Sequence, residues 1–315
     1  MIYLKPMENN DILTHLGYNG ELCILPFDHR SFFEDLLKFH EPLTPEQKNQ
    51  LTDYKKIIYG GYEKSLSLGI PKESSAILVD DEFGLDILLD AKSKGYITLQ
   101  STEISGDTHF EFAHGNEWKS WIEKVQPTFV KALVRYNVDG DKNLNQESLK
   151  GLTELSTYAH AEGYKFLIEP LVPATPEQLT SVSNDKSRYD AEIRPTLVAR
   201  MITEMQNAGV EPDIWKIEGF ADESAYTQVV TAARAGGRDY AGVISLGRNE
   251  TDETVSKWLT AGSHVPGVIG FAVGRTIFLD SLLKFQSGEM TREQAEEKIA
   301  ERFKFFYDVF NKKTA

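Results

Sequence analysis

The feature that most constrains the fold is a regular alternation of short apolar runs with helix-like segments along the 315 residues. About eight runs have the length of a β-strand, and they lie at 21–27, 75–79, 96–99, 128–136, 165–169, 212–219, 241–245 and 267–273. Nearly all of them are separated by helix-like segments such as 44–68 and 194–208. This alternation predicts a parallel sheet, and about eight repeats predict an α/β fold closed into a (β/α)8 TIM barrel.

An open, doubly wound sheet is the alternative fold. It normally has fewer strands, and no G-x-G-x-x-G motif follows the first apolar run, which argues against it. A chain of this length suits one barrel, and no linker or low-complexity tract divides it. We therefore expect a single domain over residues 1–315, in which residues 1–20, with their weak pattern, form an N-terminal extension.

The charge balance limits the partners that the chain can have. Its formal net charge is −14 and its pI is about 5.0, which argues against general binding to nucleic acid or to an anionic membrane. No apolar run approaches the ~20 residues that span a bilayer, and the N-terminus lacks a signal-peptide pattern. The single cysteine, Cys23, fits a reducing compartment. We expect a cytoplasmic protein with a small-molecule partner, and assembly into a homo-oligomer stays open.

The stretch at 212–219 carries the first chemical signal. As a strand it places Ile214, Lys216 and Glu218 on one face. Strands of a parallel barrel are covered on both faces, so a lysine there is costly unless it is paired or used. Burial lowers the pKa of a lysine and yields a nucleophilic amine of the kind that forms Schiff bases. A structural Lys–Glu ion pair, or a strand end open to water, is the alternative.

Two neighbouring strands strengthen this signal. Alternation places Lys131 and Arg135 on one face of the fourth run, and it places Glu169 on the same face of the fifth run as Leu167. If these faces point into the barrel, Lys131, Glu169 and Lys216 lie close together on adjacent strands. A shift of the fourth run by one residue would instead turn Lys131 toward the helices.

Further polar residues follow the strands at the ends where barrels build their active sites. Those at the other strand ends are Asp28, His29, Arg30, Asp80, Asp81, Glu103, Ser105, Glu218, Ser245, Gly247, Arg248, Gly274 and Arg275. From this set we predict that Asp28, His29, Arg30 and Glu218 contact a substrate. We predict the same for Arg135 at the end of the fourth run.

The last two runs predict a phosphate site. Each is followed by a glycine and an arginine, and loops after the last two strands of a barrel often bind phosphate. Glycines allow backbone N–H groups to approach an anion, and arginine pairs with it in a bidentate manner. We predict that Ser245, Gly247, Gly274 and Arg275 fix the phosphate. For either pair alone, a turn glycine beside a solvated arginine is the alternative.

A metal site is not expected. Residues 139–145 begin like a calcium-binding loop, but Leu144 occupies the position that requires glycine, and Lys150 stands where the closing glutamate belongs. The seven histidines are scattered, and only His29 lies clearly at a strand end. We expect neither a metal nor a cofactor.

Taken in order, five motifs resemble a known family. They are Phe27-Asp28-His29-Arg30, Lys131-Ala132-Leu133-Val134-Arg135-Tyr136, Ile168-Glu169-Pro170-Leu171-Val172, Trp215-Lys216-Ile217-Glu218 and Val273-Gly274-Arg275. Over residues 20–310 the chain resembles class I aldolases that cleave tagatose 1,6-bisphosphate and sulfofructose phosphate. It is more similar still to the aldolase-like domain that some bacteria fuse to 5-dehydro-2-deoxygluconokinase of inositol catabolism.

The resemblance implies roles for individual residues. Lys216 would form the imine with the substrate, with Lys131 and Glu169 as acid and base, and Gly274 and Arg275 would hold a phosphate. His29 departs from the family, which usually has glutamine at this position. The expected reaction is metal-independent cleavage of a phosphorylated ketose or keto-acid, first of all 6-phospho-5-dehydro-2-deoxygluconate. A tagatose- or fructose-type phosphate aldolase, or a non-catalytic barrel that binds a sugar phosphate, is the alternative.

Overall fold

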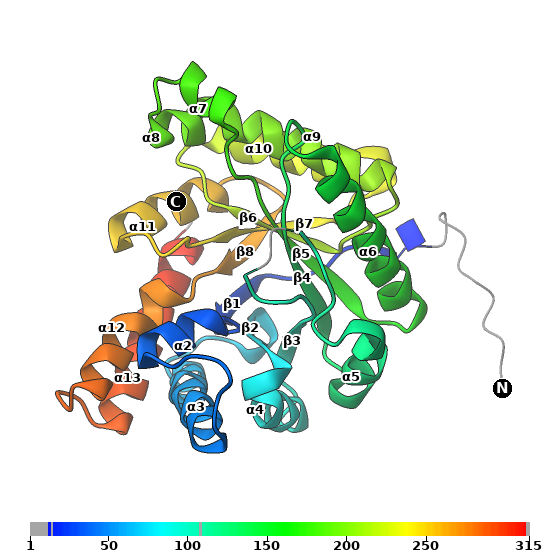
Figure 1. The fold of residues 1–315 in the computed structure, drawn as a ribbon. Helices are drawn as coiled ribbons and strands as arrows, with labels where there is room; N and C mark the ends of the chain where they lie inside the picture. The colour runs from blue at the N-terminus through cyan, green and yellow to red at the C-terminus, as the bar shows by residue number, and fades with distance from the viewer. Residues whose placement is uncertain (1–11, 14, 107–108, 313–315) are drawn as a thin grey trace.

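The computed structural model, which describes residues 12–13, 15–106 and 109–312, confirms the TIM barrel. Eight parallel strands follow one another around the barrel in chain order, and the first pairs with the last to close it (Figure 1). The strands are β1 (Leu22–Pro26), β2 (Ser75–Val79), β3 (Ile97–Ser101), β4 (Phe129–Arg135), β5 (Lys165–Leu171), β6 (Ile214–Glu218), β7 (Gly242–Leu246) and β8 (Val268–Ala272).

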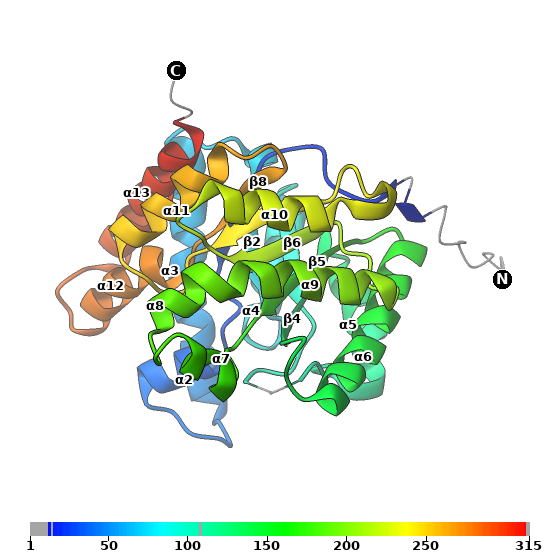
Figure 2. The ribbon, with the colours of Figure 1, turned by 90° about the horizontal axis from the view of Figure 1, so that it is seen from above.

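The helices surround the barrel (Figure 2). They are α2 (Ser31–Leu37), α3 (Pro45–Ser67), α4 (Asp81–Ser93), α5 (Trp118–Val125), α6 (Lys142–Ala161), α7 (Pro176–Ser181), α8 (Lys186–Arg188), α9 (Arg194–Asn207), α10 (Glu223–Ala233), α11 (Asp252–Ser263), α12 (Arg275–Gln286) and α13 (Arg292–Asn311). Short 3-10 turns lie at Lys72–Ser74, Gly115–Glu117 and Ala235–Gly237, and a π-helical turn lies at Tyr189–Ile193.

Local sequence signals explain where several helices begin. Thr44, Thr175 and Thr291 each form a capping box, in which the threonine side chain accepts from the N–H three residues later and a glutamine reaches back. At α3 and α7 a proline follows the capping threonine, and its missing N–H costs nothing in the first turn. Both helices thus begin with the sequence Thr-Pro-Glu.

The barrel interior changes character along its axis. Its apolar part consists of Leu22, Ile24, Ala76, Leu78, Leu99, Phe129, Leu167, Ile214, Ile244 and Ala272. On β4, β5 and β6 the apolar interior residues are Phe129, Leu167 and Ile214. Two positions further along the same strands come Lys131, Glu169 and Lys216, which therefore also face the barrel interior. The alternative with Lys131 turned toward the helices is therefore excluded.

The described part of the N-terminal segment covers the end of the barrel at which the strands begin. Leu16 is buried, the Gly17 N–H donates to Asp213 Oδ1 at 2.8 Å, and the ring of Tyr18 lies 5.4 Å from that of Phe129. Residues 1–11 and 14 of the predicted extension lie outside the described residues. With this end covered, the carboxyl ends of the strands are the end at which a ligand can enter.

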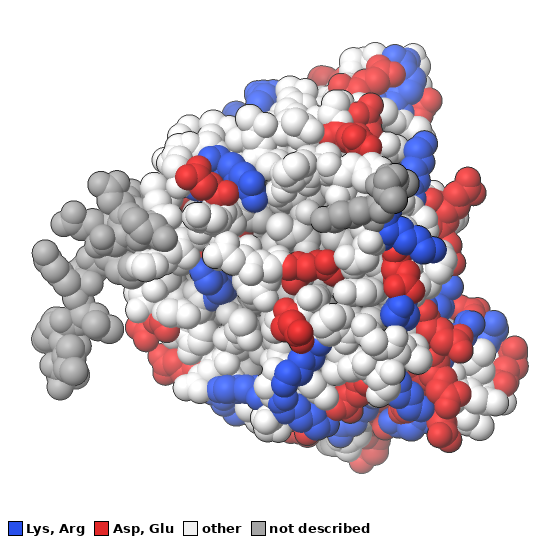
Figure 3. Space-filling view, turned by 180° about the vertical axis from the view of Figure 1, so that it is seen from behind, with Lys and Arg blue, Asp and Glu red and all other residues white. Residues whose placement is uncertain are grey.

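The outer surface carries both signs of charge. Figure 3 shows acidic and basic side chains interspersed over the face opposite to that of Figure 1. Among the helices that the structure describes, none combines the length and the apolar character that a membrane crossing requires. The described residues also contain no group of three or more His, Cys, Asp or Glu side chains arranged to hold a metal ion.

Candidate active site

A cavity of about 460 Å³ opens at the carboxyl ends of the strands. Its charged lining comprises six basic and four acidic side chains, namely Arg30, Lys131, Arg135, Lys216, Arg248 and Arg275 with Asp28, Glu103, Glu169 and Glu218. The cavity thus has a local excess of positive charge in a chain whose net charge is −14. A basic cavity in an acidic protein favours a small anionic ligand.

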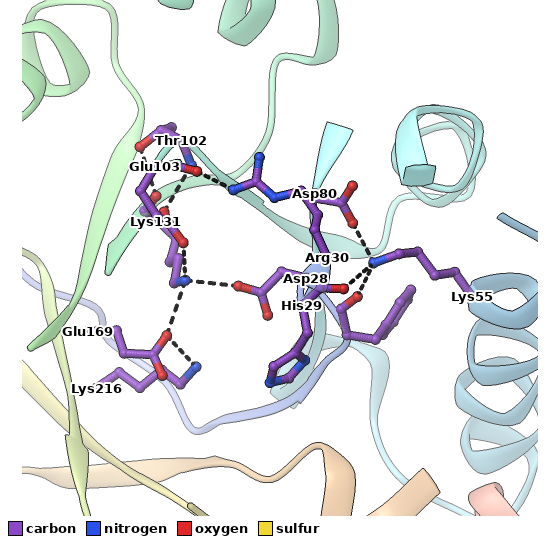
Figure 4. A network of polar contacts seen from close by, with 11 residues as sticks. Asp28, His29, Arg30, Lys55, Asp80, Thr102, Glu103, Lys131, Glu169 and Lys216 are labelled. Carbon is purple, nitrogen blue, oxygen red and sulfur yellow. Dashed lines mark hydrogen bonds and ion pairs between the residues drawn. The ribbon is translucent and has the colours of Figure 1, made fainter. Parts of the chain in front are cut away.

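Lys131 is the centre of the charged layer (Figure 4). Its Nζ lies 2.8 Å from Asp28 Oδ2, 2.5 Å from Glu103 Oε1 and 3.1 Å from Glu169 Oε2, and the side chain is almost fully buried. Burial by itself lowers the pKa of a lysine, but the three carboxylates outweigh it, so the pKa of Lys131 is raised well above its usual value. Lys131 is therefore a fixed cation.

The carboxylates around Lys131 are held in their ionised form. Burial raises the pKa of Asp28 and of Glu169, but in both cases the neighbouring ammonium groups have the larger combined effect and lower the pKa below its ordinary value. For Asp28 the main such neighbour is Lys131, and for Glu169 it is Lys216. Glu169 can thus accept a proton from a neighbouring group.

Lys216 is bonded differently from Lys131. Its side chain is only 4% exposed, and its Nζ lies 2.8 Å from Glu169 Oε2, the same oxygen that contacts Lys131. Among the described residues Glu169 is its one ion-pair partner, so two of its three N–H directions are left for a ligand. The sequence allowed a Lys–Glu pair as an alternative, and such a pair is present, but across strands; Glu218 pairs instead with Arg248 at 3.4 Å.

His29 adds an uncharged polar group. Figure 4 shows its ring beside Asp28, and both residues line the cavity. Burial is the largest cause that lowers the pKa of His29 to about 4, and the charges of Arg275 and Lys216 act in the same direction. The imidazole is therefore neutral near pH 7, and its Nδ1 has no hydrogen-bond partner in the described part of the chain.

Arg275 and the start of α12 form the basic wall next to β1. The guanidinium lies over the ring of Phe32, 5.6 Å from its centroid, and the described residues give it no ion pair. Gly274 precedes it, and a Cβ there would lie 2.5 Å from the carbonyl oxygen of Pro26, so only glycine allows this close approach to β1. Unpaired N–H groups at a helix N-terminus and an unpaired guanidinium together suit a phosphate.

The loop after β7 differs from the prediction. The Ser245 side chain faces the helices and accepts from the Tyr226 hydroxyl at 2.8 Å, so the prediction that it contacts phosphate is wrong for this side chain. The Gly247 N–H donates to the Ala272 carbonyl at 3.3 Å, and Gly247 is not part of the cavity lining. This loop lines the cavity through Leu246 and Arg248 instead.

Residues 13–314 match a family model described as "Uncharacterized protein conserved in bacteria (DUF2090)". This chain belongs to the DUF2090 family. Over 229 residues it is 24% identical to the tagatose 1,6-diphosphate aldolase of Streptococcus pneumoniae, with 68% of this chain and 66% of that relative covered. The chain thus spans just under two thirds of the length of the curated relative it matches.

Two solved structures share the fold of this DUF2090 protein. An archaeal fructose 1,6-bisphosphate aldolase is 12% identical with a TM-score of 0.56, and 95% of this chain and 97% of that one are covered. A Schiff-base-forming fructose-1,6-bisphosphate aldolase is 11% identical with a TM-score of 0.55, and 95% of this chain and 98% of that one are covered. At these identities the likeness establishes the barrel fold.

Two charged residues of the DUF2090 cavity were not selected from the sequence as site residues. Glu103 pairs with Lys131, and it lies four residues beyond Leu99, which is in the barrel interior. The same alternation that selected Lys131 would have selected it. Arg248 pairs with Asp190 at 2.8 Å. Asp190 lies in the π-helical turn before α9, and the strand pattern does not predict a contact with that turn. Arg135 lies at the exposed rim of the cavity, as its position at the end of β4 indicated.

Proposed function

We propose that this chain is a class I aldolase, a lyase that cleaves a carbon–carbon bond through a Schiff base on Lys216. The observation that carries the proposal is the contrast between two buried lysines. Lys131 is saturated by three carboxylates, whereas Lys216 has one carboxylate partner at 2.8 Å and otherwise faces the cavity. The names of the tagatose and Schiff-base-forming relatives support the same reaction class.

Imine formation needs a neutral amine and an acid that removes water. Lys216 gives a proton to Glu169, and its lone pair attacks the ketone carbon of the substrate. A proton then moves from the nitrogen to the new alkoxide oxygen, which gives the neutral carbinolamine. Glu169 then returns the proton to the carbinolamine hydroxyl, which leaves as water while the nitrogen lone pair forms the iminium double bond. The 2.8 Å contact between Lys216 Nζ and Glu169 Oε2 allows the first transfer without rearrangement.

Cleavage uses the iminium as the electron acceptor. Glu169, ionised again, takes the proton of the hydroxyl on the carbon two bonds from the iminium carbon. The carbonyl of an aldehyde forms, the carbon–carbon bond breaks, and its electron pair makes an enamine. The enamine takes up at carbon the proton that Glu169 now carries, and water hydrolyses the resulting imine to release the second product. The fixed charge of Lys131 favours return of Glu169 to its carboxylate form.

Two groups of side chains in the cavity would contact different parts of a phosphorylated substrate. Arg275, Gly274 and the N-terminus of α12 would hold the phosphate. Asp28, His29 and Arg30 would contact the aldehyde-forming part of the substrate, with Arg135 and Glu218 at the rim.

We favour 6-phospho-5-dehydro-2-deoxygluconate as the substrate, cleaved to dihydroxyacetone phosphate and malonate semialdehyde in inositol catabolism in the cytoplasm. Its phosphate and carboxylate match the excess of basic side chains that line the cavity. We assign His29 to the aldehyde side of this substrate. The name of the tagatose relative favours a tagatose- or fructose-type phosphate as the second candidate. A barrel that binds a sugar phosphate without turnover is the third.

The test is reduction with borohydride in the presence of each candidate ketose phosphate, followed by intact-mass measurement and peptide mapping. We expect a covalent adduct on Lys216 with the true substrate and with dihydroxyacetone phosphate, and none in Lys216→Met. An adduct on Lys131, or binding of all candidates with no adduct, would contradict the proposal. The candidate that gives the fastest release of dihydroxyacetone phosphate identifies the substrate.

A further inference from the structure

A third buried lysine, Lys55, lies behind the cavity and takes no part in the steps above. Lys55 is in the middle of α3 and is 0% exposed, on the face that also buries Leu51 and Ile58. An apolar residue would fill this position at lower cost, because an ammonium removed from water must be compensated by partners. Its partners therefore indicate what it does.

Those partners are at the end of β1 and β2 (Figure 4). Lys55 Nζ donates to the carbonyl oxygen of Phe27 at 2.6 Å and to that of His29 at 3.1 Å, and it pairs with the carboxylate of Asp80. All three N–H groups of the ammonium are thereby used. The cation also lies 4.6 Å from the ring centroid of Phe33.

The two carbonyls flank Asp28. β1 ends at Pro26, and the N–H of Phe27 still donates to the Leu78 carbonyl at 2.9 Å. Beyond that bond the chain leaves the sheet and enters α2 at Ser31. The ammonium of Lys55 thus holds the carbonyl groups of the two residues that flank Asp28, whose carboxylate lies 2.8 Å from Lys131.

Asp80 is itself held in place. Its Oδ1 accepts from the Phe83 N–H at 2.8 Å and so caps α4, while Oδ2 faces Lys55. Lys55 and Asp80 thereby join the ends of two strands to two helices within the buried layer below the cavity.

We propose that Lys55 is a positioning residue that clamps the backbone around Asp28 and thereby sets the contact between Asp28 and Lys131. Its kinetic consequence rests on the proposed aldolase function, whereas its structural consequence does not. Without the clamp, Asp28 and the neighbouring His29 are free to move relative to the reacting groups. A displacement of about 1 Å at a reacting site can lower the rate about 100-fold.

The test must separate positioning from stability. Lys55→Met alone leaves Asp80 charged and buried, and such a variant can fail to fold. The double variant Lys55→Met/Asp80→Asn removes both charges, and asparagine is still a good helix cap. We expect the double variant to regain much of the thermal stability that the single variant loses, yet to turn over about 100-fold more slowly than the wild type.

Two further readouts make the outcome decisive. Because Lys216 is intact, borohydride should still trap the imine in the double variant, and a crystal structure of that variant should show Asp28 withdrawn from Lys131. Turnover that recovers together with stability, or Asp28 still within hydrogen-bond distance of Lys131, would overturn the proposal. A wild type that forms no adduct contradicts the aldolase function instead, and the crystal structure then decides the clamp alone.

Lys165→Met is the matched control. Lys165 also pairs with a buried aspartate, Asp213, and with a backbone carbonyl, both at 2.8 Å, but at the opposite end of the barrel. It should lose stability without a comparable loss of turnover. A 100-fold loss of turnover in the control as well would show that any lysine–aspartate pair of this barrel matters equally, which would also overturn the special role of Lys55.

Discussion

Two lysine–carboxylate pairs join β5 to β6 or to the residue before it, one at each end of the barrel. Lys165 Nζ lies 2.8 Å from Asp213 Oδ1, and Lys216 Nζ lies 2.8 Å from Glu169 Oε2. The strands, the chemistry and the distances match. The two pairs differ in how many hydrogen-bonding sites of the lysine and the carboxylate are still unused.

At the amino-terminal end of the strands, both carboxylate oxygens of Asp213 already accept hydrogen bonds. Asp213 accepts from the backbone N–H groups of Gly17 and Phe166 at 2.8 Å each, and Lys165 also donates to the His15 carbonyl. At the carboxyl end of the strands, Glu169 is shared between Lys131 and Lys216, and the ammonium group of Lys216 faces the cavity. The same ion pair is therefore structural where the backbone fills its remaining sites and available for chemistry where it does not.

The largest effect that we predict separates these two lysines. Lys216→Ala should lower turnover by about 10⁶-fold, the scale seen when the nucleophile of a covalent enzyme is removed. Lys165→Ala should leave kcat within a few fold while lowering Tm, because Lys165 is far from the cavity. Steady-state kinetics and thermal melts of both variants check this. Comparable losses of kcat would mean that the two ends do not differ in the way described.

The second prediction concerns Arg275, whose guanidinium forms no ion pair with the residues that the structure describes. Arg275→Ala should lower kcat/KM by about 10- to 100-fold, since a charge-assisted hydrogen bond contributes about 1.5–3 kcal/mol and about 1.4 kcal/mol is tenfold. The loss should nearly vanish with an unphosphorylated analogue of the substrate, which lacks the partner. Measuring both proteins with both substrates gives the comparison. Equal losses would show that Arg275 supports the fold rather than the phosphate.

The third prediction uses the imidazole of His29. The folded protein holds the pKa of His29 near 4, whereas the unfolded chain has the ordinary value of about 6.5. Between these values the unfolded state binds the extra proton, so this group makes stability rise with pH and fall as the pH drops from about 6.5 to 4. Asp28 and Glu169, whose pKa values are lowered, lose their contributions only at lower pH.

His29→Asn should therefore flatten the decline of Tm between pH 6.5 and pH 4. The charged groups that act on the imidazole are Asp28, Arg275, Lys216 and Glu169, and the variant keeps them all. Melting curves of the two proteins across this range measure the difference in slope. Parallel curves would show that His29 titrates normally in the folded state.

The smallest expected effect is that of a chelator. In the proposed mechanism the iminium on Lys216 takes the electrons released on cleavage, so no metal has that task. Incubation with excess EDTA should leave turnover unchanged. Loss of activity that a divalent ion restores would assign the carbonyl polarisation to a metal and remove the need for Lys216.

The sequence was sufficient for the barrel and for its inward faces because alternation with period 2 is a local property. It placed Lys131, Glu169 and Lys216 together without knowledge of their contacts. Ser245 was selected by its position at a strand end, although alternation from Ile244, an interior residue, turns it outward. That error came from neglecting the face, not from an ambiguous pattern.

The partners of buried charges were beyond the reach of the sequence pattern. Lys55 lies on the apolar face of α3, and two of its three partners are backbone carbonyls, which every residue possesses. Likewise, the pairing of Lys131 with Asp28 spans 103 residues of sequence. Such contacts depend on the register and closure of the whole barrel, which no local pattern contains.

The three carboxylates around Lys131 have a consequence for folding. Asp28 follows β1, Glu103 follows β3 and Glu169 belongs to β5, so the cation on β4 has its full set of partners only when strands from both halves of the barrel are in place. An intermediate with β1 to β4 alone would bury an ammonium short of one partner, and the remaining strands would carry Glu169 beside a single lysine. Incomplete burial of charge raises the free energy of such partial structures. The charged layer therefore makes closure of this barrel more cooperative. If β1–β4 and β5–β8 are produced as separate chains, neither chain should form its part of the site.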